Sequence, residues 1–185
     1  MKSTIFNNIL RVLLIILPLI LLLSCRKQAA SKKAPEMTAK EEKEMLLRVN
    51  KFLVQKDAEL IESYSKRRGW NMEVSETGLF YEIYEPALGK KVEQGDIIDL
   101  KYELSLLDGT LCYTSDEDGN KIFRLGKSQE ISGLEQGVAF MRAGDKARFI
   151  IPPHLAYGLL GDENRIPARA IIIYQVELVD VKSSD

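Results

Sequence analysis

The hydrophobic and polar positions divide the chain into three stretches of different periodicity. The first, residues 1–24, contains the basic residues Lys2 and Arg11 and then a run from Val12 to Leu23, in which only Pro18 interrupts large aliphatic side chains. A basic start followed by such a run is typical of an export signal. Because the run is shorter than the roughly 20 apolar residues of a membrane-spanning helix, we predict that residues 1–24 are a signal peptide.

The second stretch, residues 38–68, has the spacing of an amphipathic helix. Leu46, Val49 and Leu53 recur at intervals of three and four positions, as they would on one face of a helix. The pattern weakens around Lys56, which leaves open either one long helix or two shorter helices joined there. The apolar stripe predicts packing, either onto the domain that follows or onto a second copy of the chain.

Both ends of this stretch carry residues that favour helix termini. Thr38 and Glu41 form a capping-box pattern, in which a hydroxyl and a carboxylate bind each other's backbone N–H groups. The basic residues Lys66, Arg67 and Arg68 precede Gly69, as expected where a helix ends and its dipole is negative. We therefore predict a helical arm over residues 38–68.

In the third stretch, short β-rich runs alternate with turn residues. All twelve glycines lie at or after Gly69. Apolar and polar residues alternate from Leu100 to Leu106, as in a strand with one buried face, and Asp108-Gly109 is a hairpin signal. One helical segment, residues 133–141, interrupts the runs. The pattern predicts an α+β domain, with an antiparallel sheet wrapped around one short helix. The runs are 79–84, 97–107, 110–113, 122–125, 147–151 and 170–181.

Composition and charge exclude several classes of protein. The chain has 26 Lys and Arg against 27 Asp and Glu, a net charge of -1, which leaves no basic footprint for nucleic acid. Two cysteines and one histidine are too few for a Cys/His zinc site, an iron–sulfur cluster or a disulfide framework. We predict no metal, no cofactor and no nucleic-acid partner. Asp116, Glu117 and Asp118 are interpreted as a solvated acidic turn rather than a calcium loop.

The end of the apolar run carries a lipidation pattern. Leu22-Leu23-Ser24-Cys25 resembles a bacterial lipobox, in which the cysteine becomes acylated and begins the mature protein. A plain cleaved signal and an N-terminal anchor helix are the alternatives. Residues 25–37 are rich in Lys, Ala, Ser and Pro and predict a flexible tether. The expected location is the bacterial cell envelope, lipid-anchored on the periplasmic face of the outer membrane.

A series of short motifs in the third stretch resembles the FKBP-type peptidyl-prolyl cis-trans isomerases. The resemblance implies such a domain over residues 77–185, and with the lipobox and arm it extends to exported FKBP-type lipoproteins, some of which are linked to gliding motility. The motifs occur in the family's order: Tyr102, Asp108-Gly109, Leu125-Gly126, Ile131-x-Gly133, Gly137-Val138, Met141-x-x-Gly144, Ile151-Pro152-Pro153, Leu155-Ala156-Tyr157-Gly158, Ile166-Pro167 and Val176-Glu177-Leu178.

Prolyl isomerisation needs a shaped pocket rather than a nucleophile. Rotation about the bond crosses a barrier of about 18–20 kcal/mol, because the planar amide is resonance-stabilised. An apolar pocket that binds the twisted amide better than the planar one lowers that barrier. The resemblance implies that Leu134 forms the pocket floor, where the family usually has Trp, and that the Tyr157 phenol and the Ile131 N–H bind substrate. The implied pocket residues are Tyr102, Phe123, Ile131, Leu134, Tyr157, Ile166 and Tyr174.

Four residues depart from the family pattern around this pocket. Cys112 replaces an aromatic wall, Tyr113 replaces an Asp that organises the site, Lys121 stands where an aromatic is common and Glu130 where an apolar residue is common. The departures predict reduced activity or altered specificity.

Two functions remain open on the sequence alone. One is an envelope-anchored isomerase that helps exported proteins fold by acting on proline-containing unfolded or extended polypeptides. The other is a catalytically weak FKBP-like binding or scaffold module of an envelope complex such as a gliding machinery. In both, the membrane is reached through the lipid anchor, and the helical arm is available for a homodimer.

Overall fold

The computed structural model describes residues 37–183. The chain divides into two compact units, residues 1–43 and 44–185. The predicted signal peptide, Cys25 and the tether up to residue 36 lie outside the described residues. Within the part that is described, no helix combines the length and the apolar character needed to cross a membrane.

The predicted arm is a single helix, α2 (Ala39–Arg68), which continues through Lys56 without a break. The capping box forms at its start, where Thr38 N donates to Glu41 Oε2 at 2.8 Å and Glu41 N donates to Thr38 Oγ1 at 3.3 Å. At its end Gly69 takes a φ of 68°, a left-handed conformation that glycine adopts without steric cost.

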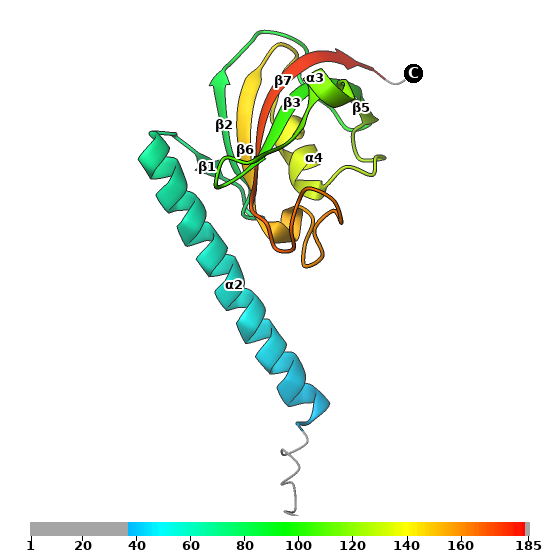
Figure 1. The fold of residues 1–185 in the computed structure, drawn as a ribbon. Helices are drawn as coiled ribbons and strands as arrows, with labels where there is room; N and C mark the ends of the chain where they lie inside the picture. Colours follow the sequence, from blue (N-terminus) through cyan, green and yellow to red (C-terminus); the bar gives the residue numbers. More distant parts are fainter. Residues whose placement is uncertain (1–36, 184–185) are drawn as a thin grey trace, which may run out of the picture. The chain divides into compact units, whose positions relative to one another are not determined.

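The third stretch forms one seven-stranded antiparallel sheet with the strand order β1-β2-β6-β7-β3-β4, in which β5 also pairs with β3. Figure 1 shows the sheet curving around the helix α4 (Ser132–Ala139). The predicted α+β class and its helical arm are therefore confirmed. The strands are β1 (Glu73–Val74), β2 (Phe80–Glu85), β3 (Ile97–Leu106), β4 (Leu111–Thr114), β5 (Lys121–Arg124), β6 (Lys146–Ile151) and β7 (Ile172–Lys182).

Three short elements were not anticipated by the sequence pattern. These are the strand β1, the one-turn helix α3 (Ser115–Asp118) and the 3-10 helix η1 (Pro153–Leu155). The predicted acidic turn is a single helical turn whose three acidic side chains, Asp116, Glu117 and Asp118, are exposed to solvent. Thr114 caps α3 by accepting a hydrogen bond from Asp116 N, and acidic residues in a first helical turn are favoured by the helix dipole.

The main core lies between α4 and the sheet. Leu134 and Val138 of α4 are fully buried against residues such as Phe149, Ile151 and Tyr174. Two glycines allow α4 to approach this closely. A Cβ on Gly137 would lie 2.7 Å from the Phe149 ring, and a Cβ on Gly133 would overlap Ile151.

A second core cluster joins the C-terminal half of α2 to the outer face of the sheet. Ile61 is fully buried and Tyr64 nearly so, and they belong to one cluster with Ile150, Ile171 and Ile173. Because side chains alternate along a strand, β7 presents Ile173 to this cluster and Tyr174 to the main core.

Candidate active site

All seven predicted site residues lie in or against the main core cluster. Five are buried members of it, and Ile131 and Tyr157 are partly buried and pack against it. They come from elements far apart in the sequence: β3, β5, the start of α4, the segment after η1, the loop 158–169 and β7. The fold thus brings the set together. The buried members are Tyr102, Phe123, Leu134, Ile166 and Tyr174.

Tyrosines from β3, β7 and the segment after η1 give this region its polar groups. The rings of Tyr102 and Tyr174 lie 5.8 Å apart between centroids, with 49° between their planes. Burial, with the Asp118 and Glu130 carboxylates nearby, raises the pKa of Tyr102 to about 12. Burial also raises the pKa of Tyr157, and that of Tyr174 to well above its usual range. All three phenols therefore keep their protons at neutral pH and can donate hydrogen bonds.

The hydroxyl of Tyr174 is buried, and no hydrogen bond of normal geometry joins it to any residue in the described part of the chain. Tyr157 is close enough to affect its pKa. A buried polar group without a partner costs free energy, so it is found mainly where a ligand, water or function satisfies it. This hydroxyl is a donor or acceptor that the sequence did not single out, since Tyr174 was predicted only as one of the residues around the pocket.

Ile131 precedes α4 as its N-cap, in an extended conformation with φ -63° and ψ 144°. Its carbonyl accepts hydrogen bonds from Leu134 N at 3.0 Å and Glu135 N at 3.2 Å. These bonds fix the backbone at the residue whose own N–H is predicted to bind the substrate. Leu134 itself is fully buried at the start of the same helix.

Two of the departures from the family pattern form an ion pair with each other. Lys121 Nζ lies 2.9 Å from Glu130 Oε1 and 3.0 Å from Oε2. The two side chains are only 23% and 21% exposed, and the ammonium lies 5.1 Å from the centroid of the Tyr102 ring. The pair therefore places balanced charges beside the pocket, where the family usually has apolar side chains.

A double-mutant cycle on this pair should reveal coupling. Lys121→Met and Glu130→Leu each leave one half-buried charge without its counter-charge, whereas the double variant removes both charges. We expect each single variant to lose about 1 kcal/mol of unfolding free energy and the double variant to recover most of it. Urea denaturation measures the free energy of unfolding. The value of kcat/KM on a short X–Pro peptide reports whether apolar side chains at positions 121 and 130 increase turnover. Additive losses would show that the two residues act independently.

Tyr113, the replacement for the family's Asp, is held by the loop 158–169. Its hydroxyl donates to Asp162 Oδ2, and Asn164 Nδ2 donates to the Tyr113 oxygen at 3.1 Å. Asp162 Oδ1 accepts from Asn164 N at 2.9 Å and from Ile166 N at 2.7 Å. Burial alone would raise the pKa of Asp162, but these hydrogen bonds outweigh it and lower the pKa. Asp162 therefore connects Tyr113 to the pocket residue Ile166.

Arg165 strengthens the same connection. Its Nη1 donates to the carbonyl of Cys112 at 2.6 Å, and its guanidinium lies 5.1 Å from the centre of the Tyr113 ring. Cys112 is buried beneath these groups. Sequence reasoning missed Asp162 and Arg165. The only available signal was the Asp-x-Asn spacing of Asp162 and Asn164, which is typical of a side chain that caps its own loop.

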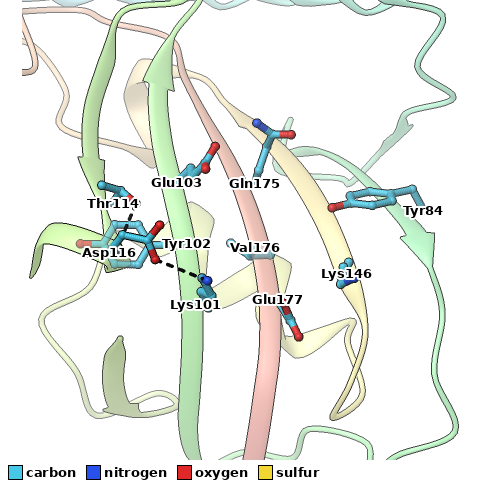
Figure 2. Close-up of a pocket in the computed structure, with 10 residues that line it drawn as sticks. All are labelled: Tyr84, Lys101, Tyr102, Glu103, Thr114, Asp116, Lys146, Gln175, Val176 and Glu177. Carbon is cyan, nitrogen blue, oxygen red and sulfur yellow. Dashed lines mark hydrogen bonds and ion pairs between the residues drawn. The ribbon is translucent and has the colours of Figure 1, made fainter. Parts of the chain in front are cut away.

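A separate groove of about 230 Å³ lies on the outer face of the sheet (Figure 2). Its lining mixes opposite charges, including the pair formed by Lys101 Nζ and Asp116 Oδ1 at 3.4 Å. Tyr102 is the one predicted site residue that borders this groove, and the rest of its lining is mostly polar, which does not suggest a prolyl pocket. Among residues 37–183, no group of three or more His, Cys, Asp and Glu side chains is placed to hold a metal ion.

Comparison with known proteins settles the family. The family model described as FKBP-type peptidyl-prolyl cis-trans isomerase matches residues 89–179. FK506-binding protein 2 of Debaryomyces hansenii is 39% identical over 108 residues, which are 58% of this chain and 79% of that protein. The chain belongs to the FKBP-type peptidyl-prolyl cis-trans isomerases. FkpA of Escherichia coli is 34% identical over 128 residues, 69% of this chain and 46% of FkpA.

Solved FKBP-type structures have the same fold. The crystal structure of FkpA from Escherichia coli aligns with a TM-score of 0.59 at 27% identity, covering 81% of this chain and 76% of that one. The crystal structure of AtFKBP13 aligns with a TM-score of 0.57 at 27% identity, covering 61% of this chain and 99% of that one. The protein is thus an FKBP-type isomerase.

Proposed function

We propose that this FKBP-type isomerase is a lipid-anchored folding catalyst of the bacterial cell envelope, acting on X–Pro bonds in unfolded or extended polypeptides. The observation that carries the proposal is the meeting of Tyr102, Tyr157 and Tyr174, all protonated, with the fully buried Leu134 in one apolar cluster. Such a cluster excludes water from the prolyl ring and favours the less polar twisted amide. Uncatalysed isomerisation takes tens to hundreds of seconds, which is slow enough to limit folding.

A refolding assay tests the proposed function. The detergent-solubilised full chain, at about one-hundredth of the substrate concentration, should shorten the slow proline-limited phase of a client protein's refolding. A client whose slow phase does not involve proline is the control and should refold at its uncatalysed rate. An unchanged slow phase together with suppressed aggregation would favour the alternative, in which the domain is a binding or scaffold module of an envelope complex.

The anchor rests on the sequence, where Cys25 follows a basic start and an apolar run. A diacylated and N-acylated cysteine carries three chains, more than the two signals that stable anchoring usually requires. In bacterial cells Cys25→Ala should move the protein from the membrane fraction to the soluble fraction. The matched control is Cys112→Ala, which removes a buried thiol and should leave fractionation unchanged. Continued tight association of the Cys25 variant with membranes would contradict lipidation as the attachment.

The proposal includes a homodimer through the exposed apolar face of α2. Leu46, Val49, Leu53 and Leu60 have the intervals of a heptad seam, and Leu46, Val49 and Leu60 are 56%, 46% and 53% exposed. Phe52 beside them is 60% exposed. A heptad seam is best buried against a second helix with the same repeat, so a second copy of the chain is the proposed partner.

Sedimentation velocity in matched-density detergent tests the dimer. The parent chain should sediment as a dimer, and the double variant Leu46→Glu with Phe52→Glu should sediment as a monomer. Lys51→Glu is the control, because it changes charge on the same helix without touching the seam. A monomeric parent chain at micromolar concentration would overturn this part of the proposal.

A further inference from the structure

One face of the C-terminal half of α2 is buried, and this face includes polar as well as apolar side chains. The buried residues of α2 are Asp57, Ile61, Tyr64 and Ser65, which recur at helical spacing on one side. Ile61 and Tyr64 pack in the second core cluster, and Ser65 Oγ donates to Ile61 O at 2.8 Å within the helix itself. Asp57 is different, because a buried carboxylate is costly unless it is paired.

The partner of Asp57 is Arg169, which is 112 positions away in the sequence. Arg169 Nη2 lies 3.0 Å from Asp57 Oδ2 and 3.2 Å from Oδ1. The Asp57 side chain is 12% exposed and that of Arg169 is 32% exposed, so the pair is shielded from solvent to a large extent. It links the helical arm directly to the end of the loop 158–169.

Arg169 also closes that loop through its backbone. Its N–H donates to Gly158 O at 2.9 Å, which joins the two ends of the loop. To do so it takes a φ of 58°, in the left-handed region, one of two non-glycine residues in the described part of the chain with a positive φ. That conformation is sterically unfavourable for an L-residue, because Cβ comes close to the following carbonyl oxygen. The ion pair to α2 offsets part of this cost, because it holds Arg169 in place.

Two pocket residues depend on the geometry of this loop. Tyr157 comes directly before it, and Ile166 lies within it and accepts a hydrogen bond from Asp162 N at 3.1 Å. Ile171 and Ile173, which follow the loop, pack with Ile61 of α2 in the second core cluster. The arm therefore contacts the chain at the loop's closing residue and at the strand that carries the pocket residue Tyr174.

We propose that Asp57 and Arg169 are positioning residues for the isomerase reaction. Through this ion pair α2 holds the loop 158–169 in the conformation that presents Tyr157 and Ile166 to the substrate. The helical arm is then part of the catalytic unit, in addition to any role in dimerisation. If the pair is broken, part of the substrate's binding free energy is spent on ordering the loop, which raises KM more than it lowers kcat.

The test compares kcat and KM for a short X–Pro peptide in the detergent-solubilised full chain. Asp57→Asn keeps the shape of the side chain and removes its charge. Glu62→Gln is the matched control, because it removes a negative charge from an exposed position of the same helix. We expect Asp57→Asn to raise KM about threefold to tenfold with kcat within about twofold of the parent, and Glu62→Gln to change neither.

Rescue and non-additivity separate positioning from simple stabilisation. Asp57→Glu retains a carboxylate and should recover most of the lost affinity. The double variant Asp57→Asn with Arg169→Met should have no higher KM than the worse single variant, because both act through one interaction. If Asp57→Asn does not fold, Arg169→Met and Arg169→Lys are measured in its place. KM is then expected to rise more in Arg169→Met than in Arg169→Lys. A lower melting temperature with unchanged kcat and KM would overturn the proposal, as would strictly additive effects on KM.

Discussion

Replacing Tyr157 with phenylalanine is expected to lower kcat/KM for X–Pro isomerisation about tenfold or more. The phenol of Tyr157 is predicted to donate a hydrogen bond to a substrate carbonyl, and losing a hydrogen bond to a group held away from water costs about 1–3 kcal/mol. The raised pKa keeps this phenol protonated, so the donor is present in the parent enzyme. Tyr157→Ala should cost more, because it also removes part of the apolar wall. A protease-coupled peptide assay measures both variants.

Tyr84→Phe is the matched control for this experiment. Tyr84 is 41% exposed and borders the groove on the outer face of the sheet (Figure 2), so its hydroxyl should not affect turnover. Tyr174→Phe extends the comparison to the buried hydroxyl near Tyr157, which makes no hydrogen bond of normal geometry to a described residue. Equal kcat/KM for the parent and Tyr157→Phe would place the substrate's hydrogen bond elsewhere.

Gly133→Ala is expected to destabilise the fold and to lower activity together. A methyl group at this position would overlap the Ile151 side chain and lie 3.0 Å from the carbonyl oxygen of Leu155. Overpacking of this kind costs about 1–3 kcal/mol, and the higher helix propensity of alanine returns at most about 1 kcal/mol. Because a backbone atom is among the contacts, α4 must shift, and with it Leu134 and Ile131.

Urea denaturation and the peptide assay measure the two consequences separately. Ser132→Ala, at the exposed neighbouring position of the same helix, removes only a long hydrogen bond of 3.4 Å to Leu155 O. It should leave both the free energy of unfolding and kcat/KM close to the parent values. Unchanged stability in Gly133→Ala would mean that the core can yield at Ile151. The close packing of α4 on the sheet would then not depend on glycine.

The periodic elements could be predicted from the sequence, because their patterns are local. The alternation in β3 and the spacing of the helix 133–141 follow directly from which side chains face the core. The capping box at Thr38 was equally local and forms as predicted. The short helix α3 was missed, because a run of three acidic residues has no periodicity and its formation depends on the cap at Thr114.

The site was only partly predictable, for a different reason. Its seven residues could be proposed from a resemblance that spans many motifs, and their catalytic roles stay predictions. The supporting contacts could not be proposed in this way. Lys121 and Glu130 each appeared as an isolated departure, although together they form one pair. Asp57 and Arg169 are separated by 112 positions, so only the folded chain brings their opposite charges together.

The high pKa values in the tyrosine cluster imply an enzyme that tolerates alkali. No step of amide rotation transfers a proton to the protein, so the rate should depend on pH only when a pocket group changes its charge. The pKa of Tyr102 is raised to about 12, so burying its neutral phenol contributes fully to folding stability at any pH below the ordinary tyrosine pKa of about 10. This contribution to the free energy of unfolding is lost as the pH rises towards 12. The charge state of this tyrosine cluster, and with it the rate of isomerisation, should therefore stay constant from neutral pH up to about pH 10.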